Sequence, residues 1–197
     1  VMGEQVHGGK VMVVSKEDKD RGFYSHDTAI PGVDGLVTSC RGLWLACFYA
    51  DCVPILLWDL TARVVGIAHA GWRGTLVNVG GEVVKTMMEV FNSKPTQIEA
   101  VIGPAIGPCC YKIGPEVTGR FLEAFPAVVL HESPQAVNLD LKAANRYILL
   151  EAGIPLKQIY TSPLCTSCEP ELFFSYRRDG NPTGRMVAGI SLSNSFG

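Results

Sequence analysis

The stretch LWLACFYADCVPILLWDLTARVVGIAHAGWRG, residues 43–74, contains three almost continuous apolar runs separated by short turns. Residues 43–49, 53–58 and 63–68 each have the length of a strand, and uninterrupted apolar character is typical of strands covered on both faces. We therefore predict three consecutive buried strands that form the core of a sheet. The last of them ends at His69, and the turn before the second contains Asp51 and Cys52.

The apolar period changes after these strands. Apolar residues recur at steps of three and four over residues 76–91, which predicts a helix with one apolar face. The pair Gly80-Gly81 inside it weakens the helix or permits a close approach. The remaining expected elements are strands over residues 10–14, 36–38, 97–102 and 158–162, helices over 115–125 and 141–152 (the second capped by Asp140), and a final hairpin of 172–176 and 186–190. Together they predict a mixed α/β (α+β) layered domain, with helices packed outside the sheets.

Length and composition limit the classes of protein. At 197 residues we expect one domain, residues 1–197, and 47% hydrophobic content is ample for a core. The charged fraction of 18% is below the usual quarter, which indicates much buried surface or a partner face. A net charge of −2 gives no basic footprint for nucleic acid or a membrane surface, and no apolar run reaches the length of a bilayer span.

Cysteine usage and the N-terminus add two expectations. Seven cysteines, an odd number without disulfide-framework spacing, and the lack of a recognisable signal peptide predict a cytoplasmic protein. Val1 is not an initiator methionine, and a predicted metal ligand lies only six residues further on, so we expect an N-terminal segment to be missing.

His7, Cys52 and His69 are the predicted ligands of one Zn²⁺. Two imidazoles and one thiolate leave a coordination position for water or substrate, which distinguishes a catalytic zinc from a structural one. Cys52 and His69 lie at the ends of adjacent predicted strands, where loops commonly carry chemistry. Their spacing is not a recognised short zinc motif, so a buried apolar cysteine and a satisfied core histidine remain alternatives.

Several motifs carry a family resemblance along the whole chain. They are Gln5-Val6-His7-Gly8, Asp34-Gly35-Leu36-Val37-Thr38, Ala50-Asp51-Cys52-Val53-Pro54, Ala68-His69-Ala70-Gly71-Trp72-Arg73-Gly74, Ile102-Gly103-Pro104-Ala105-Ile106, Cys165-Thr166, Phe173-Phe174-Ser175-Tyr176-Arg177-Arg178-Asp179-Gly180 and Thr183-Gly184-Arg185. In this order they resemble the bacterial laccase-domain, or polyphenol oxidoreductase, family. The resemblance implies a layered α-β-β-α fold with mixed sheets, metal binding by His7, Cys52 and His69, and several dozen residues ahead of the His-Gly motif.

Members of that family are also described as zinc-dependent purine nucleoside phosphorylases with adenosine deaminase activity. The resemblance therefore implies phosphate and purine nucleosides (adenosine, inosine, guanosine and methylthioadenosine) as substrates. Within that scheme Asp51 is our candidate proton shuttle. Arg73, which precedes a predicted helix, is the candidate phosphate ligand, or pairs with a surface acid. Arg185 is a second candidate for the anion, and Tyr176 either stacks on the purine or packs in the core.

Three alternatives remain open. Cys52 and His69 could form the nucleophile and base of a Cys-His hydrolase or deamidase, as in toxin deamidases of the same layered fold, although His7 has no role there. Four histidines in the whole chain are too few for a multicopper oxidase, but one Cu²⁺ in the same site would give a single-copper polyphenol oxidoreductase. A metal-binding domain without catalysis is the third.

Two further cysteine pairs stand outside this scheme. Cys165-Thr166-Ser167-Cys168 has the spacing of a second metal or redox site, whereas Cys109-Cys110 is predicted to be structural.

Overall fold

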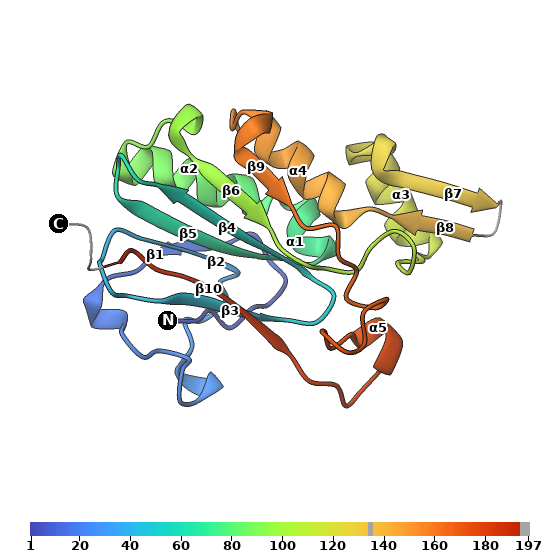
Figure 1. The fold of residues 1–197 in the computed structure, drawn as a ribbon, viewed down its shortest axis with the longest axis horizontal. Coiled ribbons are helices and arrows are strands. Elements are labelled where there is room, and N and C mark those ends of the chain that lie inside the picture. Colours follow the sequence, from blue (N-terminus) through green and yellow to red (C-terminus); the bar gives the residue numbers. More distant parts are fainter. Residues whose placement is uncertain (134–135, 194–197) are drawn as a thin grey trace.

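The computed structural model describes residues 1–133 and 136–193, so the predicted domain 1–197 also includes positions outside the described residues. Six strands form the central sheet in the order β1-β2-β5-β4-β6-β9 (Figure 1). Their bounds are Val11–Val13 for β1, Gly35–Thr38 for β2, Val53–Asp59 for β4, Val64–Ala70 for β5, Glu99–Ile102 for β6 and Ile159–Thr161 for β9. The outer pairs β1–β2 and β6–β9 are parallel and the inner pairs antiparallel, so the sheet is mixed, as predicted.

A second sheet corrects two predictions. β3 (Leu45–Tyr49) pairs antiparallel with β10 (Met186–Ile190), so it is not in one sheet with β4 and β5. Its side chains alternate in exposure, and Phe48 is 37% exposed, because this strand packs on the large sheet by one face only. The predicted partner of β10, residues 172–176, is not a strand. Ser175 instead accepts a hydrogen bond from the Arg178 N–H and caps the short helix α5 (Tyr176–Asp179).

Helices cover the other face of the large sheet (Figure 1). They are α1 (Trp72–Leu76), α2 (Val79–Phe91) and α4 (Leu141–Glu151), whereas α3 (Pro115–Ala124) packs against α1. The predicted helix over residues 76–91 is thus interrupted, because Asn78 adopts a left-handed backbone with φ +62°. The close approach expected at Gly80 is confirmed, since a Cβ there would lie 3.1 Å from Ile55. The predicted cap is confirmed too, because Asp140 accepts a hydrogen bond from Ala143 N.

Several short elements were not predicted. β7 (Val129–Ser133) and β8 (Ala136–Leu139) form a separate antiparallel pair. Five 3-10 helices span Lys16–Asp18, His26–Thr28, Pro95–Gln97, Pro126–Val128 and Leu156–Gln158. None of these is long enough to show a clear apolar period in the sequence.

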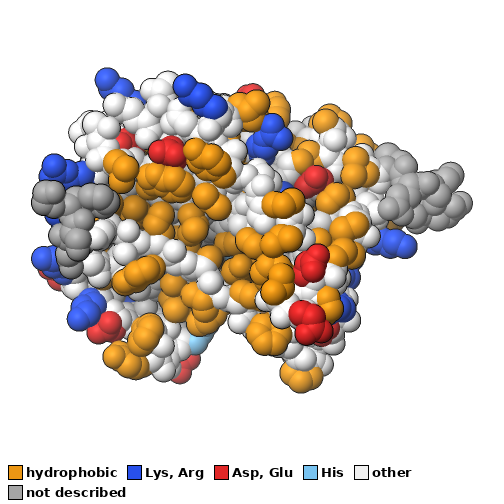
Figure 2. Space-filling view, in the orientation of Figure 1, with side chains coloured by type: hydrophobic (Ala, Val, Ile, Leu, Met, Phe, Trp, Pro, Cys, Tyr) orange, Lys and Arg blue, Asp and Glu red, His pale blue; other side chains and the backbone are white. Residues whose placement is uncertain are grey.

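The large sheet separates two hydrophobic cores. One lies between its helical face and α2 and α4, and includes Met87 and Leu149. The other lies between its opposite face and β3, and includes Leu45 and Ile67. Hydrophobic side chains also gather over much of one outer face (Figure 2), in agreement with the low charged content. Among the described residues, no helix combines the length and hydropathy that crossing a bilayer requires.

Candidate metal centre

The structure brings together His7, Cys52 and His69. One ligand atom from each lies within 4.8 Å of the other two. Cys52 directly precedes β4, and His69 lies in β5 opposite Pro54, so antiparallel pairing makes them neighbours. His69 is therefore inside its strand rather than after it, because β5 extends to Ala70. His7 comes from the loop before β1 and is exposed, which leaves this side of the group open.

Asp34 positions two of the three residues and was not among the predicted site residues. Its buried carboxylate accepts a hydrogen bond from His69 Nδ1 (2.9 Å). Nε2 of the same ring is therefore the atom left to bind a metal. The same carboxylate accepts bonds from the backbone N–H groups of His7 (3.0 Å) and Gly8 (2.7 Å). A carboxylate behind a histidine is the usual arrangement around a protein-bound metal.

Backbone conformation also adapts to this group. His7 has φ +61° and Asp51 has φ +82°, which non-glycine residues rarely adopt and which are found preferentially at functional sites. A Cβ at Gly71 would lie 2.9 Å from the His7 ring and 3.0 Å from Cys52 Sγ. Only glycine at this position lets the imidazole and the thiol approach each other.

The titration behaviour of these groups suits an anionic sulfur ligand. Burial raises the pKa of Cys52, but hydrogen bonds from His69 and His7 outweigh it and lower the pKa to about 7. Burial lowers the pKa of His69, yet Asp34 and Cys52 together raise it to about 9. A thiolate is the form that binds metal, and a cation can replace the protons that these groups share. Tetrahedral Zn²⁺ would need ligand atoms about 3.3–3.6 Å apart, given its usual bond lengths, and the limit of 4.8 Å on this set is compatible with that arrangement.

A cavity of about 620 Å³ opens beside the three residues, within the usual range for small-molecule sites. Its wall includes every residue predicted for the site: His7, Asp51, Cys52, His69, Arg73, Tyr176 and Arg185. Arg73 lies on α1 with its guanidinium 4.2 Å from the Trp72 ring. Tyr176 begins α5 and is 54% exposed, so it is not a core residue. Arg185 donates to the carbonyl oxygens of Thr183 and Gly184.

Asp51 joins the centre to the C-terminal part of the chain. One carboxylate oxygen accepts a hydrogen bond from Thr166 Oγ1 (2.6 Å), and the other accepts one from Arg177 N (2.7 Å). Each oxygen thus accepts one bond and keeps one lone pair, so Asp51 is held in place and can still accept a further hydrogen bond.

Two further residues of the cavity wall are Arg177 and Tyr111. The Arg177 guanidinium donates to Lys112 O and lies 4.9 Å from the Tyr111 ring. Burial raises the pKa of Tyr111 to about 12, which keeps its hydroxyl a neutral hydrogen-bond donor. Arg177 stands in a quoted motif, whereas Tyr111 has no signal in a single sequence.

The fold and site define a class: layered mixed α/β proteins with two imidazoles and one thiol at the wall of a ligand-sized cavity. Residues 1–193 match the family described as "Multi-copper polyphenol oxidoreductase laccase". The chain belongs to this family.

Individual relatives agree with that assignment. A protein named purine nucleoside phosphorylase YlmD, from Geobacillus stearothermophilus, is 47% identical over 95% of this chain and 70% of its own. A protein named adenosine deaminase RL5, from an unknown prokaryotic organism, is 37% identical over 96% of this chain and 74% of its own. The crystal structure of YlmD from Geobacillus stearothermophilus superposes with a TM-score of 0.94 at 46% identity, covering 98% of this chain and 73% of that one.

Proposed function

We propose that this protein is a zinc-dependent purine nucleoside phosphorylase that also deaminates adenosine. The observation that carries the proposal is the convergence of His7, Cys52 and His69 on one wall of a cavity that also presents arginines and aromatic rings. Relatives named purine nucleoside phosphorylase and adenosine deaminase support it. The expected substrates are phosphate with adenosine, inosine, guanosine or methylthioadenosine.

The donor set suits zinc. His7, Cys52 and His69 would hold the ion, and a fourth position would face the cavity. Bound zinc supplies Lewis-acid activation of water or of a substrate oxygen. Asp34 fixes the His69 ring and the His7 turn from behind, so the ligands are already positioned before substrate arrives.

Phosphorolysis requires that phosphate attack the anomeric carbon while the bond to the purine nitrogen breaks, giving ribose 1-phosphate and the base. Three arginines of the cavity wall, Arg73, Arg177 and Arg185, supply the positive charge that binds the phosphate anion. The rings of Tyr111 and Tyr176 offer flat faces on which a purine can stack. In deamination, Asp51 would move a proton between water and the leaving amine.

The test is a panel of the four nucleosides with and without phosphate, using chromatography to separate base, ribose 1-phosphate and deaminated nucleoside. We expect base release only with phosphate, inosine formation from adenosine without it, and loss of both after chelation. Arg73→Ala should raise KM for phosphate about tenfold or more, as expected for the loss of a charged contact, while metal content stays unchanged. Arg146→Ala is the matched control, because this exposed arginine of α4 lies away from the cavity. Turnover of none of the four nucleosides by zinc-loaded protein would refute the proposal.

A Cys-His hydrolase remains a second candidate, favoured by the hydrogen bond that pairs Cys52 with His69 and lowers the thiol pKa. It predicts that activity survives chelation and is lost when Cys52 is alkylated. The zinc proposal predicts loss of activity on chelation, so the same assay separates the two. Oxidation of polyphenols by the copper-loaded protein, without nucleoside turnover, would favour the single-copper alternative.

A further inference from the structure

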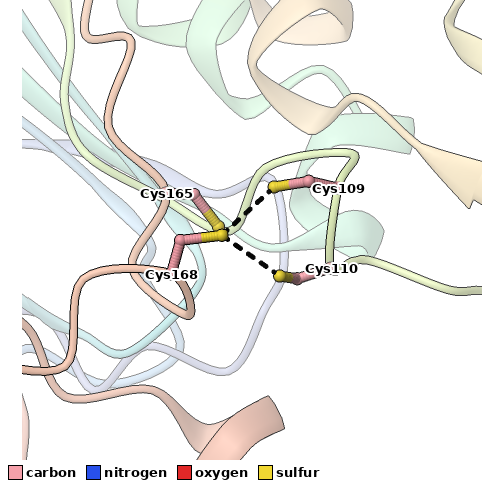
Figure 3. Close-up of side chains that lie close together, drawn as sticks. All are labelled: Cys109, Cys110, Cys165 and Cys168. Carbon is pink, nitrogen blue, oxygen red and sulfur yellow. Dashed lines mark hydrogen bonds between the residues drawn. The ribbon is translucent and has the colours of Figure 1, made fainter.

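Four cysteines outside the candidate metal centre form a second group, the cysteine cluster: Cys109, Cys110, Cys165 and Cys168 (Figure 3). Their sulfur atoms all lie within 4.8 Å of one another. Cys168 Sγ is 3.5 Å from Cys109 Sγ and 3.4 Å from Cys110 Sγ. A disulfide bond is about 2.05 Å long, so these sulfurs are in contact without being bonded. Four sulfurs around one Zn²⁺ with bonds of about 2.3 Å would be about 3.8 Å apart, close to the separations observed.

The cluster comes from two loops far apart in the sequence. Figure 3 shows Cys109 and Cys110 on one loop and Cys165 and Cys168 on the other, with their sulfur atoms pointing toward a common centre. The second pair has the C-x-x-C spacing found in zinc sites. Between the loops, Thr166 N donates to Ala105 O (3.1 Å), so the backbone already holds the two pairs opposite each other.

The surroundings stabilise negative charge on the sulfur of Cys165, whereas hydrogen bonds with the neighbouring thiols raise the pKa of Cys168 and burial raises the pKa of Cys109. Gly107 N–H donates to Cys165 Sγ at 3.1 Å. Burial raises the pKa of Cys165, but this donor and the N–H groups of Cys168 and Ser167 lower it to about 7 overall. The Arg178 guanidinium donates to the carbonyl oxygens of Thr166 and Ser167, which brings a fixed cation to the same loop. Thiolates, not thiols, are metal ligands.

We propose that Cys109, Cys110, Cys165 and Cys168 bind one zinc ion in an all-thiolate site separate from the candidate catalytic centre. All four coordination positions are taken by the protein, so this site is closed and structural. This one site combines the structural role predicted for Cys109-Cys110 with the metal binding considered for Cys165 and Cys168. A multi-iron cluster does not fit, because ligand sulfurs within 4.8 Å of one another surround a single ion.

The position of this site gives it a role in the candidate centre. The loop of Cys109 and Cys110 contains Ile106, whose N–H donates to Asp51 O at 3.0 Å. The loop of Cys165 and Cys168 contains Thr166, whose hydroxyl donates to the Asp51 carboxylate. Asp51 directly precedes Cys52. A zinc ion that joins the two loops would therefore hold Asp51 and Cys52 in place from outside the cavity.

The test counts metal in the 197-residue chain. Protein loaded with zinc and passed through a desalting column is analysed for zinc per chain by elemental and native mass spectrometry. We expect two zinc ions in the unsubstituted chain, one in Cys168→Ser and one in Cys52→Ser. Cys40→Ser is the matched control and should keep two, because Cys40 belongs to neither group. Equal zinc content in Cys168→Ser and the unsubstituted chain would overturn the proposal.

A second measurement needs no substitution. Cys109 and Cys168 are exposed, so they would react quickly with an alkylating reagent if their thiols were free. We expect peptide mapping of the zinc-loaded protein to find both unmodified, and modified once a chelator is added. Immediate modification in the presence of zinc would contradict the site. A disulfide between members of the cluster in protein purified with zinc would contradict it as well, and would assign the cysteines to a redox pair.

Discussion

Replacing Asp34 by asparagine tests whether the candidate metal centre depends on the carboxylate behind it. The Asp34 carboxylate accepts three hydrogen bonds, from His69 Nδ1 and the N–H groups of His7 and Gly8. An amide has one accepting oxygen and one NH₂ group of the same shape. Whichever way the amide is turned, its NH₂ faces at least one N–H donor, and in one orientation it faces His69.

The expected magnitude follows from these contacts. Loss of a carboxylate behind a metal-binding histidine typically lowers metal affinity 10–100-fold, or about 1.4–2.8 kcal/mol. An unpaired N–H in this buried place costs about 1–3 kcal/mol of folding stability in addition. We therefore expect Asp34→Asn to bind zinc 10–100-fold more weakly and to unfold at lower denaturant, with the larger stability deficit in the presence of zinc.

The assay is zinc competition against a chromophoric chelator, combined with denaturant unfolding with and without zinc. Asp59→Asn is the control, because this buried carboxylate also accepts two backbone N–H bonds, from Thr61 and Ala62. It lies at the far end of β4, about 23 Å from Cys52 at 3.3 Å per residue. Both bonds end on one oxygen, so the amide oxygen of asparagine can keep them, and Asp59→Asn should keep zinc affinity. If Asp34→Asn also kept unchanged zinc affinity, the role assigned to its carboxylate would be refuted.

Three more predictions concern the site and its scaffold. Gly71→Ala should lower zinc affinity about tenfold or more, because the added Cβ would press on His7 and Cys52. The control Gly119→Ala, which has open space around its Cβ, should bind zinc normally and gain about 0.5–1 kcal/mol of stability. Equal zinc affinity in both variants would contradict the steric argument. Alkylation of Cys52, followed by peptide mapping, should be slow with zinc and fast after chelation, and identical rates would exclude it as a ligand. Asp140→Ala should lower the unfolding free energy by about 0.5–2 kcal/mol through loss of the α4 cap; an unchanged denaturant midpoint would show that the cap contributes little.

The strands of the central sheet were predictable because both their faces are buried. β4 and β5 consist of long apolar runs, and every one of their residues is buried or half-buried in the structure. The pattern does not reveal which strands pair, however. β3 has a similar apolar composition but belongs to a second sheet, where it pairs with β10. The two paired segments are more than a hundred residues apart in the sequence. Local sequence carries no information about such long-range pairing.

The error at residues 172–176 has a local cause. Phe173 and Phe174 are aromatic residues of high strand propensity, yet they lead into a serine-capped helical turn. Side chain–backbone hydrogen bonds of this kind compete with strand pairing. The cap residue Ser175 stands three residues before its donor, Arg178, and this spacing is too common to decide the structure against two phenylalanines.

The candidate metal centre shows the same division between local and long-range information. Cys52 and His69 are connected by one strand pair, so their proximity follows from a short β-connection that the sequence indicates. His7 is different, because its backbone has a positive φ and is held by Asp34 rather than by a neighbour in the chain. The motif that begins with Asp34 contained the missing signal, but an aspartate before a glycine is typical of a turn and is usually interpreted as one. Since one carboxylate positions both His7 and His69, the ligand set depends on β2 lying beside β5. Any change that separates these two strands should therefore abolish metal binding before it unfolds the sheet.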